Sequence, residues 1–147
     1  MTRKYGRIKQ EMVFPASPEE IYDMLVDPAK HSEFTGFKAE NEARVGGRFM
    51  AGDGYIIGKN IALRPGLRIV QEWKTKEWPD GYPPSILKIT LRKEGDGTKM
   101  ILEQTRVPSS QAEYYAKGWK EYYWKPLLSY LQSKRRDRSS VLNIKTE

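Results

Sequence analysis

Few residues in this sequence have the types and spacing that catalysis or metal binding requires. The chain contains no cysteine and only one histidine, His31, which excludes thiolate nucleophiles, cysteine-bound metals and paired-histidine metal sites. A catalytic histidine needs a nucleophile beside it, and the sequence shows no convincing catalytic arrangement of that kind. The glycine clusters at 45–47 and 52–54 precede no helix start, so they do not predict a phosphate-binding loop. We therefore expect no metal, no cofactor and no catalytic residue.

Two glutamates and two glutamines on the expected strands are the remaining polar candidates. Glu72 and Glu103 fall on the strand faces opposite their apolar neighbours, which predicts solvated cross-strand charges rather than an acid–base pair. Gln71 and Gln104 fall on the inward faces, where a buried amide needs a hydrogen-bond partner. They are the better candidates for polar groups in a binding pocket.

The segment KGWKEYYWKPLLSYL, residues 117–131, carries more aromatic rings than one buried helical stripe needs. Pro126 offers no N–H to the carbonyl of Tyr122, so we expect the helix to bend there and to follow a concave sheet. Gly118 is expected to permit a close approach of the helix to the sheet. On a helical wheel, one broad face and its flank contain Trp119, Tyr123, Pro126, Tyr130, Leu127 and Leu131.

These rings have two interpretations. They could roof an internal cavity, with tyrosine hydroxyls offering a few polar contacts to a ligand. They could equally fill an ordinary core, with the hydroxyls reaching solvent. The sequence leaves both open.

The elements that must position these residues begin with a strand at 7–14, followed by two short helices. Ser17 before Pro18, with Glu20 three residues after the cap, predicts a capped helix start. Asp27 before Pro28 repeats the pattern and predicts a second helix over about 28–34. Two short helices in series after one strand form a distinctive unit.

Residues 37–107 have the pattern of about six antiparallel strands. Glycine-containing turn signals lie at 46–47, 53–54 and 65–66, and Asp96-Gly97 predicts a hairpin. The proline- and glycine-rich stretch 76–85 predicts a loop. Ser109 or Ser110 is expected to cap a final helix that runs to about residue 134.

This order of elements predicts an α+β fold in which a curved antiparallel sheet grips one long C-terminal helix. A curved sheet touches a straight helix along a limited line, so we expect a space between them. The residues expected to line this ligand-binding cavity are Phe49, Ile61, Trp73, Leu87, Ile89, Met100, Leu102, Gln104, Trp119, Tyr123 and Leu127.

The net charge of +7 lies at the two ends of the chain. Residues 1–10 contain four basic side chains and no acid, and residues 134–147 carry a net +3, which leaves 11–133 balanced. A nucleic-acid-binding fold usually carries its charge on a folded face, so no nucleic-acid partner is expected. We expect one domain over 1–134 and a basic, disordered tail over 135–147.

Four segments, in this order, resemble the helix-grip START-like (SRPBCC) superfamily. They are VFPASPEEIYDMLVDPAKHSEFTG at 13–36, VGGRF at 45–49, RPGLRIVQEW at 64–73, and the spacing of GW, YYW, PL and YL over 118–131. Within it they look most like the branch named after the activator of heat-shock protein 90 ATPase, specifically its C-terminal domain. The resemblance covers about residues 8–132. It implies six or seven antiparallel strands around a long C-terminal helix, an internal apolar cavity, and a structural or pocket-rim position for His31.

Three functions follow, in order of preference. The first is a non-catalytic protein that binds a lipid-like or other hydrophobic small molecule in the cavity. The second, which the family branch alone suggests, is a chaperone-interacting protein. The third is an enzyme of the cyclase or isomerase type, for which no acid–base pair is evident. We expect a cytoplasmic monomer without a membrane span, because no apolar run approaches the roughly 20 residues that a span requires.

Overall fold

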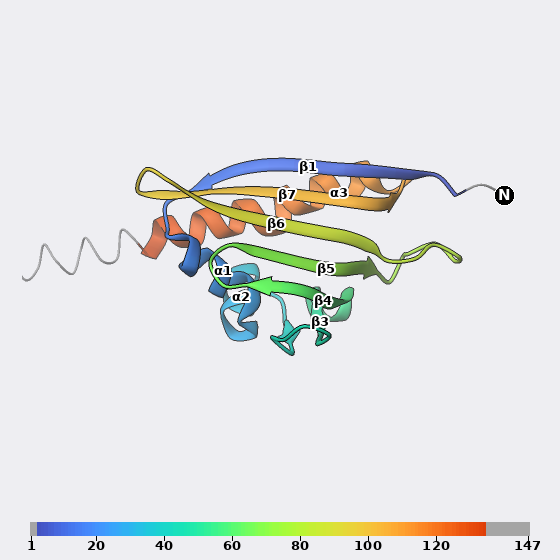
Figure 1. Ribbon diagram of the computed structural model, residues 1–147, viewed down its shortest axis with the longest axis horizontal. Helices are drawn as coiled ribbons and strands as arrows, with labels where there is room; N and C mark the ends of the chain where they lie inside the picture. Colours follow the sequence, from blue (N-terminus) through green and yellow to red (C-terminus); the bar gives the residue numbers. More distant parts are fainter. Residues whose placement is uncertain (1–2, 135–147) are drawn as a thin grey trace, which may run out of the picture.

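A seven-stranded antiparallel sheet forms the frame of the protein in the computed structural model, which describes residues 3–134 (Figure 1). The strand order is β1-β7-β6-β5-β4-β3-β2. The strands are β1 (Tyr5–Phe14), β2 (Glu40–Asn41), β3 (Arg48–Ala51), β4 (Ile56–Arg64), β5 (Arg68–Thr75), β6 (Ser85–Glu94) and β7 (Gly97–Pro108). The helices are α1 (Pro18–Val26), α2 (Pro28–Thr35), the short η1 (Gly52–Gly54) and α3 (Ala112–Trp119), which continues to residue 134.

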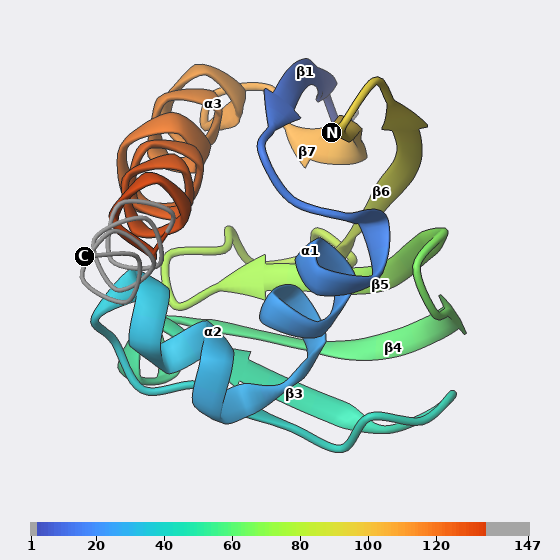
Figure 2. The ribbon, with the colours of Figure 1, turned by 90° about the vertical axis from the view of Figure 1, so that its left-hand side faces the viewer.

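The C-terminal helix, residues 112–134, lies on the concave side of the sheet together with α1 and α2 (Figure 2). The sheet curves from β1 and β7 round to β3, so it partly encloses these helices. This is the expected α+β helix-grip fold, with seven strands. The expected tail, 135–147, lies outside the described residues.

Both short helices begin as the sequence predicts. The Ser17 side chain accepts a hydrogen bond from the backbone N–H of Glu20 at 3.1 Å, and Asp27 accepts one from Lys30 at 3.1 Å. Each cap satisfies one of the N–H groups that a helix start leaves unpaired. Proline follows each cap at the first helical position, where its missing N–H has no effect.

The predicted β6–β7 hairpin is present, but its turn lies one residue earlier than expected. Glu94 pairs with Gly97, so the turn residues are Gly95 and Asp96. Gly95 has a φ of 59°, a conformation that glycine adopts without strain. A Cβ atom at Gly97 would lie 2.4 Å from the carbonyl oxygen of Phe14, so the neighbouring β1 chain requires a glycine there.

The start of the C-terminal helix differs from the prediction. Gln111 occupies the N-cap position with no side-chain capping bond, so neither Ser109 nor Ser110 caps the helix. The two serines were expected there because serine is a preferred cap. Ser109 instead belongs to the β7–α3 turn, where its N–H donates to the carbonyl of Lys4 beside β1.

The helix accommodates Pro126 through a π-helical segment, η2 (Lys120–Trp124), directly before it. In this wider turn the N–H of Lys125 donates to the carbonyl of Lys120, five residues back. A proline ring collides with the carbonyl four residues earlier in an α-helix, and a π turn changes the position of that carbonyl. The sequence therefore predicted that the helix is irregular near Pro126, and the structure shows that the irregularity is a π-helical segment.

Two glutamines join this helix to the β1–β7 edge of the sheet. Gln104 of β7 accepts a hydrogen bond from Trp119 Nε1 at 2.8 Å and donates to Ser85 Oγ at 2.9 Å. Gln10 of β1 accepts one from Trp124 Nε1 at 2.7 Å and donates to a helix carbonyl. The prediction that Gln104 is buried and needs partners is confirmed, whereas the matching role of Gln10 was not predicted.

Buried helix residues differ from the wheel prediction in one respect. Trp124 is 1% exposed and belongs to the core, together with Leu127 and Leu131. Pro126 and Tyr130, which were assigned to the buried face, are only half-buried. The π segment adds a residue to one turn and rotates the following positions, which a wheel drawn at 3.6 residues per turn does not include.

Within residues 3–134, the helices are too short or too polar to cross a membrane.

Candidate functional site

The interior behind the C-terminal helix holds a small cavity of about 30 Å³. Such a space has room for about one water molecule. Six of the eleven residues that were expected to line a ligand cavity do line it: Phe49, Trp73, Leu87, Ile89, Trp119 and Tyr123. The inner space of the grip is therefore largely filled by side chains.

Four other expected lining residues belong to the packed core. Met100, Leu102, Gln104 and Leu127 are each 0% exposed, and none borders this cavity. Their inward direction was predicted from strand and helix periodicity. Their close packing depends on neighbours from other elements.

The assignment of Ile61 to the cavity is wrong. Its side chain is 40% exposed, while its neighbour Asn60 is 1% exposed. Successive side chains on a strand point to opposite faces. Because the Asn60 side chain points inward, the Ile61 side chain points outward. The register of β4 also shifts between Asn60 and Ala62, which the sequence did not reveal.

A larger groove of about 490 Å³ opens along one side of the C-terminal helix. Its opposite wall comes from the segment after α2, from η1 and from the start of β4. The lining residues are Thr35, Phe37, Gly52, Tyr55, Ile56, Trp73, Tyr114, Tyr115, Lys117, Gly118, Trp119, Glu121, Tyr122 and Tyr123. Three of the predicted residues, Trp73, Trp119 and Tyr123, line both this groove and the small inner cavity.

The groove uses a helical stripe that the sequence analysis did not single out. Positions three and four apart lie on one helix face. The positions that follow this spacing along the groove are Tyr114, Lys117, Gly118, Glu121 and Tyr122. The signal was present as tyrosines eight residues apart. Helical periodicity favours the stripe of Trp119 and Tyr123, which is buried, whereas Tyr114 and Tyr122 are each 60% exposed.

Gly118 contributes open space to this groove. A Cβ atom there would meet nothing within 4 Å, so the predicted close approach to the sheet is wrong. Gly118 lies on the helix face beside the groove rather than on the face that packs on the sheet. Its missing side chain leaves part of the groove empty.

Two exposed aromatic rings lie at the rim. Phe37 is 43% exposed and Tyr122 is 60% exposed, and their ring centroids lie 6.5 Å apart at an interplanar angle of 74°. Phe37 follows the Gly36 cap of α2, whereas Tyr122 belongs to η2. The pair therefore joins the two walls of the groove at its surface.

His31 lines the small inner cavity and is hydrogen-bonded there as a neutral structural group. Its Nδ1 is 3.0 Å from the carbonyl oxygen of Leu25, which can only accept, so Nδ1 carries the proton. Its Nε2 then accepts from the Tyr123 hydroxyl at 2.8 Å. Burial lowers the pKa of His31 below its ordinary value, and the hydrogen bond to Leu25 opposes this in part. Burial likewise raises the pKa of Tyr123.

A cluster of hydroxyl groups lies at the Tyr115 side of the groove. The Tyr115 hydroxyl lies 2.5 Å from Thr75 Oγ1 and donates to Gln111 Oε1 at 3.1 Å. The Tyr55 hydroxyl is buried and has no hydrogen-bond partner among the described residues, although Thr75 and Tyr115 lie nearby. Burial raises the pKa of both tyrosines. Both phenols are therefore neutral, and the proton of Tyr115 is donated to Gln111 while the Tyr55 hydroxyl can still donate one.

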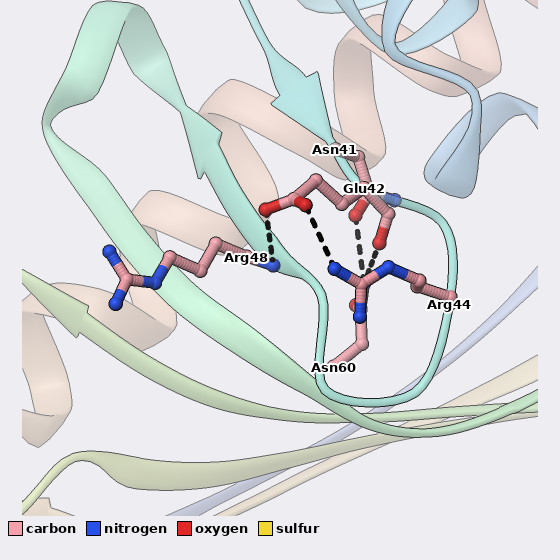
Figure 3. A network of polar contacts seen from close by, with 5 residues as sticks. All are labelled: Asn41, Glu42, Arg44, Arg48 and Asn60. Atoms are coloured by element: carbon pink, nitrogen blue, oxygen red, sulfur yellow. Dashed lines mark hydrogen bonds and ion pairs between the residues drawn. The ribbon is translucent and has the colours of Figure 1, made fainter.

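A polar network holds the loop before β3, at the edge of the sheet that β2 and β3 form (Figure 3). The buried Asn60 donates to Asn41 Oδ1 and to the carbonyl of Glu42, both at 2.9 Å. Its own Oδ1 accepts from Gln71, which was predicted to face inward and lines the small cavity. Glu42 also accepts from the N–H of Arg48 at 3.2 Å. Each of these bonds holds loop backbone or satisfies a buried amide, so the network is structural.

The two strand glutamates are cross-strand charges, as predicted. Glu103 lies 3.6 Å from Lys88, its register partner on β6. Glu72 pairs in register with Lys59 on β4. Within residues 3–134, no group of three or more histidine, aspartate or glutamate side chains could hold a metal ion.

Comparisons with known proteins agree on one family. The family model described as "Activator of Hsp90 ATPase homolog 1-like protein" matches residues 15–132. The human "Activator of 90 kDa heat shock protein ATPase homolog 1" is 32% identical over 118 residues, which are 80% of this chain and 35% of the human protein. The chain thus spans about a third of the length of the curated relatives it matches.

Solved structures share the fold. An HSP90 activator from Plasmodium falciparum superposes with a TM-score of 0.75 at 20% identity, over 81% of this chain and 91% of that protein. CalU16 from Micromonospora echinospora superposes with a TM-score of 0.72 at 22% identity, over 88% and 82% of the two chains. With a seven-stranded helix-grip fold and a family match over most of its length, the chain belongs to the family of Activator of Hsp90 ATPase homolog 1-like proteins.

Proposed function

We propose that this chain is a non-catalytic protein that binds a hydrophobic small molecule in the groove beside its C-terminal helix. The observation that carries the proposal is the groove itself, whose volume is about 490 Å³ and whose lining includes Trp73, Trp119 and Tyr123. Small-molecule sites are typically concave, largely apolar and roughly 300–1,000 Å³ in volume. The inner cavity of about 30 Å³ is too small for this purpose.

Gly118 provides the test of this proposal. A side chain at this position would meet nothing within 4 Å, so Gly118→Leu is expected to occupy part of the groove without a clash. Replacing a helical glycine with leucine also favours the helix by roughly 0.5–1 kcal/mol. The variant should therefore fold at least as well as the parent and bind less ligand. Gly118→Ala is the matched control, because it brings a similar gain in helix propensity with little added volume.

The measurement is isothermal titration calorimetry with dodecanol, supported by tryptophan emission from Trp73 and Trp119 at the groove. We expect saturable binding to the parent and to Gly118→Ala, and at least tenfold weaker binding to Gly118→Leu. Equal binding to all three proteins would place the ligand elsewhere. No saturable binding to the parent, together with no small molecule found in native mass spectra of the purified protein, would reject the proposal.

The second candidate is contact with a chaperone, which the comparisons favour. The human relative is an activator of a heat-shock protein ATPase, and this chain matches about a third of it. We expect this chain alone to stimulate a heat-shock protein 90 ATPase weakly or not at all. Strong stimulation that surface substitutions remove and Gly118→Leu leaves intact would favour the chaperone function over the ligand function. A cytoplasmic location stays a prediction for either function.

A further inference from the structure

The lining of the groove carries one positive charge that has no partner within the described residues. Lys117 is exposed and lines the groove, and its side-chain ammonium forms no ion pair or hydrogen bond with the described residues. A lysine ammonium has three hydrogen-bond donors and no acceptor capacity. Its position between Tyr114 and Gly118 places its stem beside the apolar part of the groove.

The carboxylate that lines the groove is already engaged. Glu121 Oε1 lies 2.5 Å from Nζ of Lys125, four residues later on the same helix. The orientation, glutamate before lysine, is the favourable one for such a pair. Glu121 therefore has a partner, whereas the ammonium of Lys117 has none within residues 3–134, so Lys117 is the lining charge without a counter-charge.

From this arrangement we propose that the groove prefers an anionic amphiphile, with its acyl chain on the aromatic lining and its carboxylate beside Lys117. This rests on the proposed function and names the class of ligand. Neighbouring groups suit such a ligand, because the exposed phenols of Tyr114 and Tyr122 line the same helix stripe and can donate hydrogen bonds. An amphiphile with an ammonium head would instead face the charge of Lys117.

The experiment compares dodecanoate with dodecanol and dodecylamine, all below their micellar concentrations. Isothermal titration calorimetry measures each dissociation constant for the parent, Lys117→Met, Lys117→Glu and Lys120→Glu. Lys120 is the matched control, because it is exposed on the same helix but does not line the groove. Circular dichroism checks that all four proteins have the same helix content and melting temperature.

We expect dodecanoate to bind the parent more tightly than dodecanol, and dodecylamine to bind most weakly. Lys117→Met should weaken dodecanoate binding roughly two- to fivefold, as removal of one exposed ion pair does. Lys117→Glu should weaken it further and reverse the order of dodecanoate and dodecylamine. Lys120→Glu and dodecanol binding to every variant should change less than twofold.

Equal dissociation constants for dodecanoate and dodecanol on the parent would overturn the inference and leave the proposed function in place. The same conclusion follows if Lys117→Glu and Lys120→Glu weaken dodecanoate binding equally, because the charge effect would then be nonspecific. If none of the three amphiphiles binds saturably, this inference is overturned. If native mass spectra of the purified protein also show no small molecule, the proposed function is overturned with it.

Discussion

At the scale of single residues, two hydrogen bonds determine the charge of His31. Leu25 accepts from Nδ1 and Tyr123 donates to Nε2, so the neutral ring satisfies both neighbours. A second proton on Nε2 would displace the Tyr123 proton from this contact and place a charge in a buried environment. Burial accordingly keeps the pKa of His31 below its ordinary value of 6.5.

This lowered pKa predicts a loss of stability in mild acid. As the pH falls through 6.5, the unfolded chain binds a proton at His31 before the folded chain does. The free energy of unfolding should therefore fall with pH below 6.5, with a slope from this group of at most about 1.4 kcal/mol per pH unit. In His31→Gln, urea unfolding between about pH 7.5 and pH 5.5 should show a clearly smaller slope. Identical slopes in the parent and the variant would contradict this account.

A second residue-scale prediction separates the packed core from the outer face of the sheet. Leu102 is 0% exposed and borders neither the inner cavity nor the groove, so Leu102→Trp should overpack the core. Overpacking typically costs about 1–3 kcal/mol, so the melting temperature should fall. Ile61→Trp is the control, because Ile61 is 40% exposed and its replacement should change stability by less than about 0.5 kcal/mol. An unchanged melting temperature for Leu102→Trp would show that the interior has more free volume than the structure indicates.

At the scale of elements, the C-terminal helix is held by polar contacts as well as by apolar packing. Gln104 and Gln10 lie on β7 and β1, and they accept hydrogen bonds from Trp119 and Trp124, which lie in successive turns of the helix. Both bonds connect a strand to the helix. They therefore set the position of the helix along the sheet, and with it the width of the groove.

A double-mutant cycle tests this connection. Gln104→Leu leaves the Trp119 N–H unpaired in a buried place and removes the acceptor role of Ser85, which should cost about 1–3 kcal/mol. Trp119→Phe removes the other partner, so the two effects should overlap and the double variant should lose less than their sum. Chemical unfolding of the parent, both single variants and the double variant measures the coupling. Strictly additive losses would mean that this hydrogen bond contributes nothing.

At the scale of the whole molecule, the net charge of +7 comes from residues 1–10 and 134–147, and residues 11–133 are balanced. Two of the basic residues near the N-terminus, Arg7 and Lys9, lie on β1. Some charged side chains on the sheet are paired with opposite charges, as in the Lys88–Glu103 and Lys99–Glu11 pairs. We therefore expect a polyanion to contact the basic ends of the chain more strongly than the balanced residues 11–133.

Removal of residues 135–147 tests this distribution of charge. The truncated chain should keep its melting temperature, because the truncation removes none of the helix and strand residues that the structure describes within 3–134. Any DNA binding seen at low salt should weaken strongly, since such binding depends on the number of phosphate contacts. Fluorescence anisotropy with a labelled duplex, with and without added salt, measures the effect. Salt-resistant binding by the truncated chain would reveal a nucleic-acid surface on the folded part.

The sequence by itself determined most of the elements. Caps such as Ser17 and Asp27 act on backbone groups three residues away, so a short window of sequence contains all the information required. Strand parity likewise predicted the inward direction of Leu102 and Gln104 and the outward direction of Glu103. The order of these elements predicted a curved sheet around one long helix, and the family resemblance implied the same fold.

Only the tertiary structure decided where the molecule is hollow. The width of a cavity depends on how closely the helix and sheet approach, and that distance depends on residues far apart in sequence, such as Gln10 and Trp124. Local periodicity predicted which residues face inward, but not that Met100 and Leu127 would be fully packed. It also could not show that a π turn before Pro126 would rotate the helix, or that Gly118 would open onto a groove. Cavity volume is the difference between enclosed space and side-chain volume, and this small difference appears only when all elements are in place.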